Sequence, residues 1–329
     1  MANNFSNKKP SRRQFLAGAA ALSAGSAAAG SVSASGDPLI TEVQEWAQIT
    51  GDGVDATPYG LPIEFEKDVV RRNVGWLTAD TISSINFTPI HALDGTITPQ
   101  GCAFERHHSG AIELRKQDYR LMINGLVDQE LIFTYEDLER FPREQHVYFC
   151  ECAANTGMEW AGAQLNGVQF THGMIHNMEY TGVPLRTLLN EAGLNAAGDL
   201  KGKWIFVEGA DASSNGRSIP MEKALDDVLV AFKANGEALR KEHGYPVRLV
   251  VPGWEGNMWV KWLRRVEVLD KPVESREETS KYTDTLADGT SRKWTWAMDA
   301  KSVVTSPSPQ APVTPVSYTH LTLPTTGIV

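Results

Sequence analysis

The chain has 329 residues, of which 42% are hydrophobic and 22% are charged, so it can bury a sizeable core and does not belong to the disordered class. Lys and Arg number 31 against 40 Asp and Glu, and the net charge of −9 argues against nucleic-acid binding by bulk electrostatics. No stretch of about 18 residues is apolar without interruption, so we expect no membrane span. Three cysteines are too few for a disulfide framework.

The first 36 residues have the pattern of an export signal that is removed from the mature protein. A basic start ends in Arg12-Arg13, and a weakly apolar run rich in Ala, Gly and Ser follows to about Gly30. We therefore expect a twin-arginine signal peptide over 1–36 and a periplasmic location. The alternative is an ordinary amphipathic N-terminal helix, although the Ala/Gly run lacks a helical stripe.

Between residues 37 and 290, strand-like and helix-like segments alternate irregularly. Capping and stop signals predict short helices over 134–141 and 184–192. Alternating or β-rich patterns predict strands over 119–125, 146–152, 203–207, 228–233, 247–251 and 266–269. Many strands and few short helices predict an α+β fold with mixed β-sheets, and the glycine motifs of nucleotide-binding folds are missing.

Cys150 and Cys152 lie two residues apart on a predicted strand, so their side chains should point to the same face. A disulfide between them would be strained, and C-x-C is not a zinc-site spacing. The sequence has no C-x-x-C-H motif, so we expect no haem in this chain. On composition alone, either residue also fits a buried, inert cysteine.

Three further segments gather cations or exposed backbone N–H groups. Residues 104–108 put one arginine beside two histidines, which suits an anion. Residues 243–248 form a turn that leads into a strand. Residues 252–262 carry two glycines and Lys261, and such a loop can cradle a phosphate. Taken singly, these segments also fit a solvated basic loop, a hairpin turn with exposed charge and a Gly-rich hairpin.

Taken together, the segments resemble the signature motifs of the sulfite oxidase family of molybdopterin oxidoreductases. The resemblance covers about residues 63–305 and rests on the stretches Phe104–His108, Cys152–Asn155, Asn235–Gly253 and Val260–Leu263. It implies a sulfite-oxidase-type molybdopterin-binding domain over 37–290 that holds one molybdenum–molybdopterin cofactor. It also implies a C-terminal immunoglobulin-like dimerisation domain, truncated here to its start at 291–305, and a homodimer in full-length relatives.

The resemblance also assigns roles to residues. It implies that Cys152 is the thiolate ligand of molybdenum, and that Arg106, Cys152 and Tyr282 are catalytic. It implies a binding set for the pterin and its phosphate, namely Phe104, Arg106, His107, His108, Cys152, Asp211, Ser218, His243, Arg248, Trp259, Val260 and Lys261. The chemistry is consistent, because molybdenum needs soft sulfur donors and a phosphate needs cations and N–H groups.

Departures from the family pattern bear on the substrate. Residues 156–160, Thr-Gly-Met-Glu-Trp, follow the cysteine motif where sulfite oxidases tend to carry arginines. With residues 171–176 and 253–257, this stretch looks like the molybdenum subunit of Sox-pathway sulfane dehydrogenases. The likeness implies oxidation of sulfane sulfur, as a persulfide on a carrier protein, during sulfur or thiosulfate oxidation, with electrons passing to a c-type cytochrome.

Two kinds of alternative stay open. One is another enzyme of the same family, either a sulfite:cytochrome c oxidoreductase or a periplasmic methionine-sulfoxide reductase. The other is a cofactor-free protein of the same fold that binds anions or serves as a scaffold. Molybdenum content distinguishes the second kind from the enzymes.

Residues 306–329 form an unusual tail. From Ser302 to Val329 the chain has no Asp, Glu, Lys or Arg, and Thr, Pro, Ser and Val dominate. Either the tail is disordered, as its composition predicts, or it is not native to the gene, since residues 316–324 look like translated adapter sequence.

Overall fold

The structure is a computed structural model. The residues that it describes are 48–51, 53, 56, 61–78, 80–162, 164, 166–194, 202–213, 215–308 and 312. The chain divides into two units, Met1–Leu61 and Pro62–Val329, and the description below concerns the second. The expected signal peptide at 1–36 lies outside the described residues, and so does the expected tail except for 306–308 and 312. Within the described part of the chain, no helix has the length and apolar character needed to cross a membrane.

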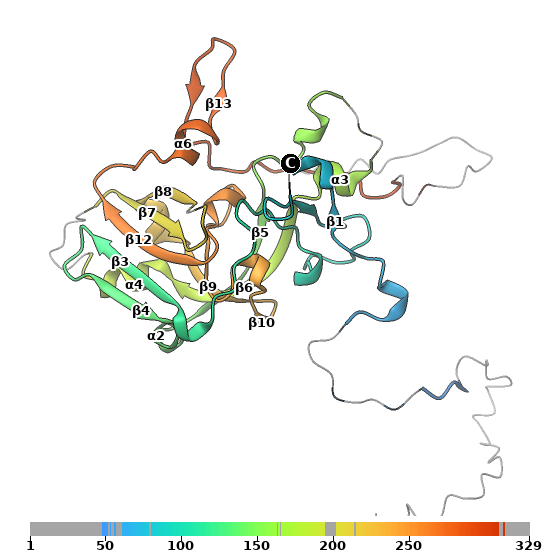
Figure 1. The fold of residues 1–329 in the computed structure, drawn as a ribbon, viewed down its shortest axis with the longest axis horizontal. Helices are drawn as coiled ribbons and strands as arrows, with labels where there is room; N and C mark the ends of the chain where they lie inside the picture. Colours follow the sequence, from blue (N-terminus) through green and yellow to red (C-terminus); the bar gives the residue numbers. More distant parts are fainter. Residues whose placement is uncertain are drawn as a thin grey trace, which may run out of the picture. The chain divides into compact units, whose positions relative to one another are not determined.

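One five-stranded sheet is antiparallel throughout (Figure 1). Its strands follow the order β10 (Glu237–Ala238), β9 (Leu229–Ala234), β6 (Ile175–Pro184) and β5 (Glu144–Glu151), and β11 (Arg248–Val250) also pairs with β9. In the long β5–β6 pair, Cys150 stands opposite His176. This sheet therefore brings Cys150 and His176 together and holds Arg248 on a neighbouring strand.

The other five-stranded sheet is mixed. Its order is β4 (Leu131–Thr134), β3 (Arg120–Gly125), β12 (Leu263–Leu269), β7 (Trp204–Gly209) and β8 (Gly216–Pro220). The β3–β12 pair is parallel and the remaining pairs are antiparallel. Along β7, half-buried and buried residues alternate, as expected for a strand with one face on the core.

The α-helices are short: α2 (Tyr135–Arg140), α3 (Val168–His172), α4 (Leu185–Glu191), α5 (Met221–Asp226) and α6 (Arg276–Ser280). Thr134 caps α2, because its hydroxyl accepts from the Asp137 N–H at 3.1 Å while the Asp137 carboxylate accepts from the Thr134 N–H at 2.9 Å. Single 3₁₀ turns link many elements: Glu64–Glu66, Gly75–Leu77, Gln100–Cys102, Lys116–Asp118, Gly157–Glu159, Lys241–His243 and Gly256–Met258.

Two small ladders complete the fold: β1 (Arg72–Asn73) with β2 (Asn86–Phe87), and β13 (Asp284–Thr285) with β14 (Ser291–Arg292). In Figure 1 the β13–β14 hairpin extends away from the larger sheets, and its paired residues are exposed. The domain boundary expected between residues 290 and 291 falls inside this hairpin. The first residues of the expected dimerisation domain, Ser291 and Arg292, therefore pair with Thr285 and Asp284 of the preceding domain.

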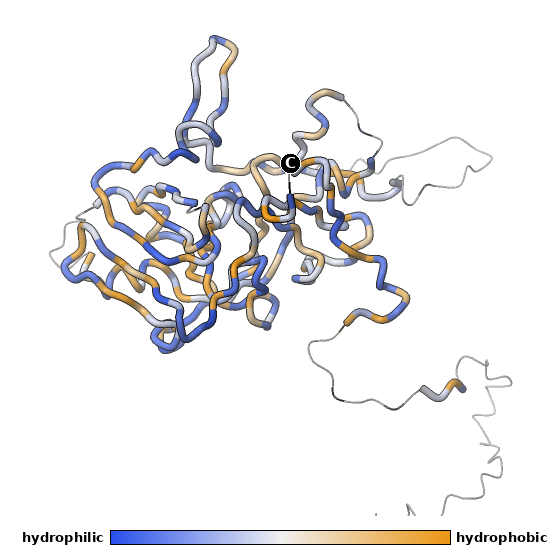
Figure 2. The backbone as a smooth tube through the Cα atoms, in the orientation of Figure 1, coloured by the Kyte–Doolittle hydropathy of each residue, from blue (hydrophilic) through white to orange (hydrophobic). Residues whose placement is uncertain are grey.

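One apolar cluster joins both five-stranded sheets, with Leu121 and Ile205 from the mixed sheet and Met178 and Val230 from the antiparallel sheet. In Figure 2, apolar residues concentrate along the strands of these sheets, whereas the β13–β14 hairpin is mostly polar. Mixed sheets with short helices confirm the predicted α+β class. Each strand and helix predicted from the sequence is present, with ends that differ by up to three residues.

Candidate cofactor and active site

One cleft gathers most of the residues singled out from the sequence. Its empty volume, counted out to open solvent, is about 790 Å³, which lies in the range of small-molecule sites. The predicted site residues in its wall are Phe104, Arg106, His107, His108, Cys152, Asp211, His243, Arg248, Trp259, Lys261 and Tyr282. Positions 178 residues apart in the chain thus meet at one site.

Ser218 and Val260 are the two predicted site residues that do not line this cleft. The Ser218 hydroxyl donates to Glu278 at 3.1 Å, and its N–H donates to the same carboxylate. The Val260 N–H donates to the Met258 carbonyl at 3.0 Å, and the Val260 carbonyl accepts from the Leu249 N–H at 2.8 Å. The polar groups of both residues are therefore occupied within the protein.

Other wall residues were not assigned from the sequence, namely Glu105, Cys150, His176, Ser213, Asn215, Glu242, Gly256, Asn257 and Trp262. Adjacency to an assigned residue was a usable signal for Glu105 and Glu242. His176 lies in the 171–176 stretch that resembles sulfane dehydrogenases, but that resemblance did not place it in the cleft, because it reaches the cleft through the pairing of β6 with β5.

Cys150, on the edge strand β5, and Cys152, directly after that strand, line the same cleft, as the strand alternation predicted. Both are free thiols. The Cys152 N–H donates to the Met174 carbonyl at 2.9 Å, and the Cys152 carbonyl accepts from the Asn155 N–H at 2.9 Å. Burial raises the pKa of both thiols, to about 12 for Cys150. Thiolate formation therefore needs a strong electrophile such as a metal ion.

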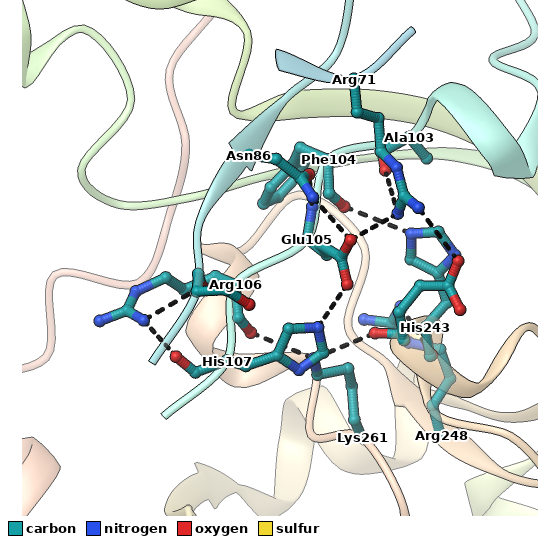
Figure 3. Close-up of polar contacts among 12 residues, drawn as sticks. Arg71, Asn86, Ala103, Phe104, Glu105, Arg106, His107, His243, Arg248 and Lys261 are labelled. Carbon is teal, nitrogen blue, oxygen red and sulfur yellow. Dashed lines mark hydrogen bonds and ion pairs between the residues drawn. The ribbon is translucent and has the colours of Figure 1, made fainter. Parts of the chain in front are cut away.

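A chain of polar contacts runs along one wall from Arg71 to Lys261 (Figure 3). The Arg71 guanidinium lies 2.8 Å from the Glu105 carboxylate, which also accepts from Nε2 of His107 at 2.5 Å. Nδ1 of His107 accepts from Lys261 Nζ at 3.0 Å. These partners assign a neutral His107 protonated at Nε2, in agreement with a pKa that burial lowers. Burial alone raises the pKa of Glu105, but the His107 hydrogen bond and the Arg71 charge together lower it to about 2.

Lys261 uses its ammonium group on neutral acceptors. Its Nζ donates to Nδ1 of His107 at 3.0 Å and to the carbonyl oxygens of Arg106 and Glu242, each at 3.1 Å. Burial, followed by the charge of Arg248, lowers the pKa of Lys261 to about 7. An anion bound beside it would favour the charged form again, so the cleft is prepared for a negative ligand.

Arg248, which also lines the cleft, likewise donates to neutral backbone acceptors. Its guanidinium donates to the carbonyl oxygens of His243 at 3.2 Å and Trp259 at 3.1 Å. His243 Nε2 lies 3.3 Å from the Phe104 carbonyl, and burial, with the neighbouring His176 and Arg248, lowers its pKa well below the usual value. A neutral His243 and a charged Arg248 therefore share this end of the cleft.

Four buried polar atoms in the cleft wall have no hydrogen-bond partner among the described residues. They are Nδ1 of His176, Nδ1 of His243, Oδ1 of Asn257 and Nε1 of Trp262. Buried polar atoms are rarely left without partners, so such a concentration indicates a ligand with both donors and acceptors.

Arg106 and Tyr282 line the cleft together with Cys152. One nitrogen of the Arg106 guanidinium, Nη1, is anchored to the Ser83 hydroxyl and the Ser84 carbonyl, each at 3.3 Å. Burial and then the Cys152 sulfur raise the pKa of Tyr282 to about 12, so its phenol is protonated at neutral pH. The set provides a cation, a proton donor and a sulfur ligand in one place.

Two glycines allow the elements around the cleft to approach closely. Gly244 has a φ of +101°, and a Cβ there would lie 3.0 Å from Cβ of Lys261 and 3.1 Å from Cβ of Arg248. A Cβ on Gly256 would lie 2.9 Å from the Glu151 carbonyl oxygen. Side chains at these positions would push apart the segments that carry the cations and the cysteines.

Residues 108–277 match the family model described as the oxidoreductase molybdopterin binding domain. The chain belongs to the sulfite oxidase family of molybdopterin oxidoreductases. Most of the cleft wall lies within the matched range, and the remainder comes from residues 104–107 and Tyr282.

The chain resembles several known members and homologues of this family. It is 35% identical over 184 residues to mitochondrial sulfite oxidase of Mus musculus, covering 53% of this chain and 33% of that protein. It is 32% identical over 194 residues to inducible nitrate reductase [NADH] 1 of Glycine max, covering 55% of this chain and 22% of that protein. The chain therefore spans a third or less of the length of these two relatives.

A solved structure resembles the chain far more strongly in sequence. The sulfane dehydrogenase SoxCD from Paracoccus pantotrophus matches with 72% identity and a TM-score of 0.78, covering 84% of this chain and 70% of that chain.

The cleft fits the molybdenum–pterin cofactor of the family. No group of three or more His, Cys, Asp or Glu residues in the described part of the chain could hold a metal ion alone, so a metal at Cys152 needs donors from a cofactor. Lys261 and Arg248 offer uncompensated charge to a phosphate, and the unpaired polar atoms offer partners to a heterocycle. We find no residue in the wall that conflicts with this cofactor.

Proposed function

We propose that this protein is a molybdenum-dependent oxidoreductase that oxidises sulfane sulfur, in the form of a persulfide on a carrier protein, during sulfur or thiosulfate oxidation. The observation that carries this proposal is the meeting of the Cys152 thiol with Arg106 and Tyr282 in a cleft rich in uncompensated cations. The 72% identity to a sulfane dehydrogenase supports the choice of substrate.

In this proposal, the bound cofactor supplies two-electron redox chemistry at a metal that prefers soft sulfur ligands. Cys152 provides the protein's sulfur ligand. Lys261, Arg248 and the neutral His243 hold the phosphate and the pterin. Arg106 orients the anionic end of the substrate, and Tyr282 donates a hydrogen bond beside it, because its phenol keeps its proton at neutral pH.

The electrons leave to another chain, a c-type cytochrome, since the sequence contains no C-x-x-C-H motif for haem attachment. We further propose that the protein acts in the periplasm after twin-arginine export, and that longer relatives form homodimers through the domain whose start is at 291–305. The carrier protein that bears the persulfide is the second partner.

Steady-state kinetics with the cofactor-loaded protein test the choice of substrate. We expect poor turnover of free sulfite and better turnover of a carrier-bound persulfide, with a c-type cytochrome as acceptor in both assays. The reason is that no arginine occupies residues 156–160 to contact free sulfite directly, and one lost direct contact with a charged group costs about 1–3 kcal/mol, or about 5- to 150-fold in affinity.

A kcat/KM for sulfite equal to or above that for the carrier-bound persulfide would contradict this choice. It would favour a sulfite:cytochrome c oxidoreductase instead. Reduction of a methionine sulfoxide without oxidation of either sulfur substrate would favour the reductase of the same family.

A further inference from the structure

Arg217 is a buried cation with no role in the function proposed above. It lies on β8 opposite Val207, and only 2% of its surface is exposed. Its Nε donates to the Met258 sulfur at 3.0 Å, and a thioether is a weak acceptor. Its Nη1 is buried and has no hydrogen-bond partner among the described residues.

The neighbouring carboxylates are committed elsewhere. Glu278 accepts from the Ser218 N–H, the Ser218 hydroxyl and, at 3.0 Å, the Ser275 N–H. Glu255 accepts from the Asn257 side-chain amide at 2.7 Å. Within the described part of the chain, no carboxylate comes within ion-pair distance of Arg217, which is unusual because buried charges are normally paired.

The guanidinium of Arg217 lies against Tyr282, a residue of the cleft wall. It stacks 4.9 Å from the ring centroid of Tyr282, within the distance of a cation–π interaction. Tyr282 lines the same cleft as Cys152 and Arg106. In surroundings of low dielectric constant, the charge of Arg217 also acts on an anion bound in the cleft beside Tyr282.

We propose that Arg217 is the second cation of the substrate subsite, where its charge acts through Tyr282 on a compact sulfur-centred anion held by Arg106. This inference rests on the proposed function and deepens it. Arg217 is a positioning residue, because it acts through the Tyr282 ring. The anion it favours is either a sulfur oxyanion or the terminal sulfur of a persulfide.

The same geometry explains why the fold tolerates this charge. A buried cation without an ion-pair partner destabilises the protein, whereas an anion bound in the cleft beside Tyr282 compensates it. Binding of the anion and stability of the folded protein are therefore linked, and anion binding should raise the melting temperature.

The test uses the cofactor-loaded protein, with inorganic sulfate as the probe and chloride at equal ionic strength as the reference. The affinity for sulfate is measured from its effect on the melting temperature, independently of turnover. Arg217→Met should weaken sulfate binding by at least about fivefold, because it removes the buried charge that acts on the anion through Tyr282. Arg217→Lys, which keeps the charge, should stay within about threefold of the unmodified protein.

Arg264→Met is the matched control, because Arg264 is an exposed arginine on β12 that pairs with Glu208 at 2.6 Å. It should bind sulfate as the unmodified protein does. The two sources of the anion are then compared through KM, for free sulfite and for a carrier-bound persulfide. A rise in KM with kcat nearly unchanged, for at least one of them in Arg217→Met, supports the inference and identifies the source.

Molybdenum content is measured in every variant, which separates this inference from the proposed function. If the unmodified protein holds no molybdenum, the proposed function fails. If molybdenum is present and Arg217→Met binds sulfate normally, this inference alone is wrong. It is also wrong if Arg217→Met loses its molybdenum while Arg264→Met keeps it. Should Arg217→Met fail to fold, a more than tenfold loss of sulfate affinity in Arg217→Lys would overturn the inference.

Discussion

The ammonium of Lys261 is held by three acceptors that carry no formal charge. Two of them belong to the 104–108 segment, since they are the Arg106 carbonyl and the His107 ring. The third is the Glu242 carbonyl, next to His243. One side chain thus fastens two cofactor-binding segments together and leaves its positive charge available to an anion in the cleft. The low pKa of about 7 is the electrostatic cost of this arrangement before the anion binds.

Lys261→Met should therefore weaken retention of the cofactor. The substitution keeps the aliphatic stem and removes the charge-assisted bond to the phosphate, which is worth about 1.5–3 kcal/mol, or about 10- to 150-fold in affinity. The measurement is the pterin remaining after extended dialysis, determined by its fluorescence after release.

Lys241→Met is the control for this prediction, since Lys241 is an exposed residue whose ammonium lies 3.5 Å from Glu113. Full occupancy in Lys241→Met and a clear loss in Lys261→Met would agree with the account. Equal retention in both variants would show that Lys261 does not hold the phosphate.

At the scale of elements, the segment 294–301 ties together two parts of the cleft. The Glu255 N–H donates to the Trp296 carbonyl at 2.7 Å, and Trp296 stacks on Trp254 with 4.6 Å between ring centroids. Lys301 reaches the buried carboxylate of Glu151, the residue before Cys152, at 2.7 Å. This segment belongs to the start of the expected dimerisation domain, yet it contacts both Trp254 and Glu255 in the 252–262 loop and Glu151 at the end of β5.

Lys301→Met should lower the free energy of unfolding by about 1–3 kcal/mol, because it leaves Glu151 buried with only the Asn155 amide, at 3.0 Å, as donor. Glu151→Gln combined with Lys301→Met should recover most of this loss, since a neutral amide needs no counter-charge. Chemical denaturation of both proteins measures the effect. Molybdenum content shows whether Cys152, directly after Glu151, can still bind the metal.

The control for this pair is Lys293→Met, because Lys293 and Glu274 form an exposed ion pair at 3.1 Å. Its effect should be within about 1 kcal/mol. A double variant no more stable than Lys301→Met alone would mean that the pairing of charges is not what matters at this position.

Local patterns predicted the strands β3, β5, β7, β9, β11 and β12 and the helices α2 and α4, but they missed the ten-residue strand β6, the strands β4 and β8, and the helices α3, α5 and α6. The cap formed by Thr134 and the leucines of α4 are features of neighbouring residues, so they could be read directly from the sequence. The pairing of β3 with β12 could not, because it joins residues more than 140 positions apart, and no period in either strand specifies its neighbour. The two-residue strands were also missed, since so short a segment has no period.

The candidate site, too, could be predicted only in part from the sequence. Motif resemblance predicted the residues that line most of the cleft, because the motifs include the residues that carry charge and sulfur. It also included Ser218, whereas the adjacent Arg217 is the residue that lies against Tyr282. The direction of a side chain on β8 depends on how that strand packs against the 256–258 turn and α6, and no local pattern contains this information.

At the scale of the whole molecule, the cleft exists only when the two sheets come together. The antiparallel sheet provides Cys150, His176 and Arg248, while the loop that leads into β12 of the mixed sheet provides Lys261. The cations and the cysteines from these elements line the same cleft. Folding and cofactor binding should therefore stabilise each other, as expected when a ligand binds only the folded state.

Elemental analysis of the purified protein tests the central claim most directly. The protein is produced in a host able to make the molybdenum cofactor, and its molybdenum content is measured beside that of two single variants. We expect about one molybdenum per chain in the unmodified protein, a large loss in Cys152→Ser, and a normal content in Cys150→Ser, because the cofactor needs one thiolate from the protein. No molybdenum in the unmodified protein, or equal loss in both variants, would contradict the account.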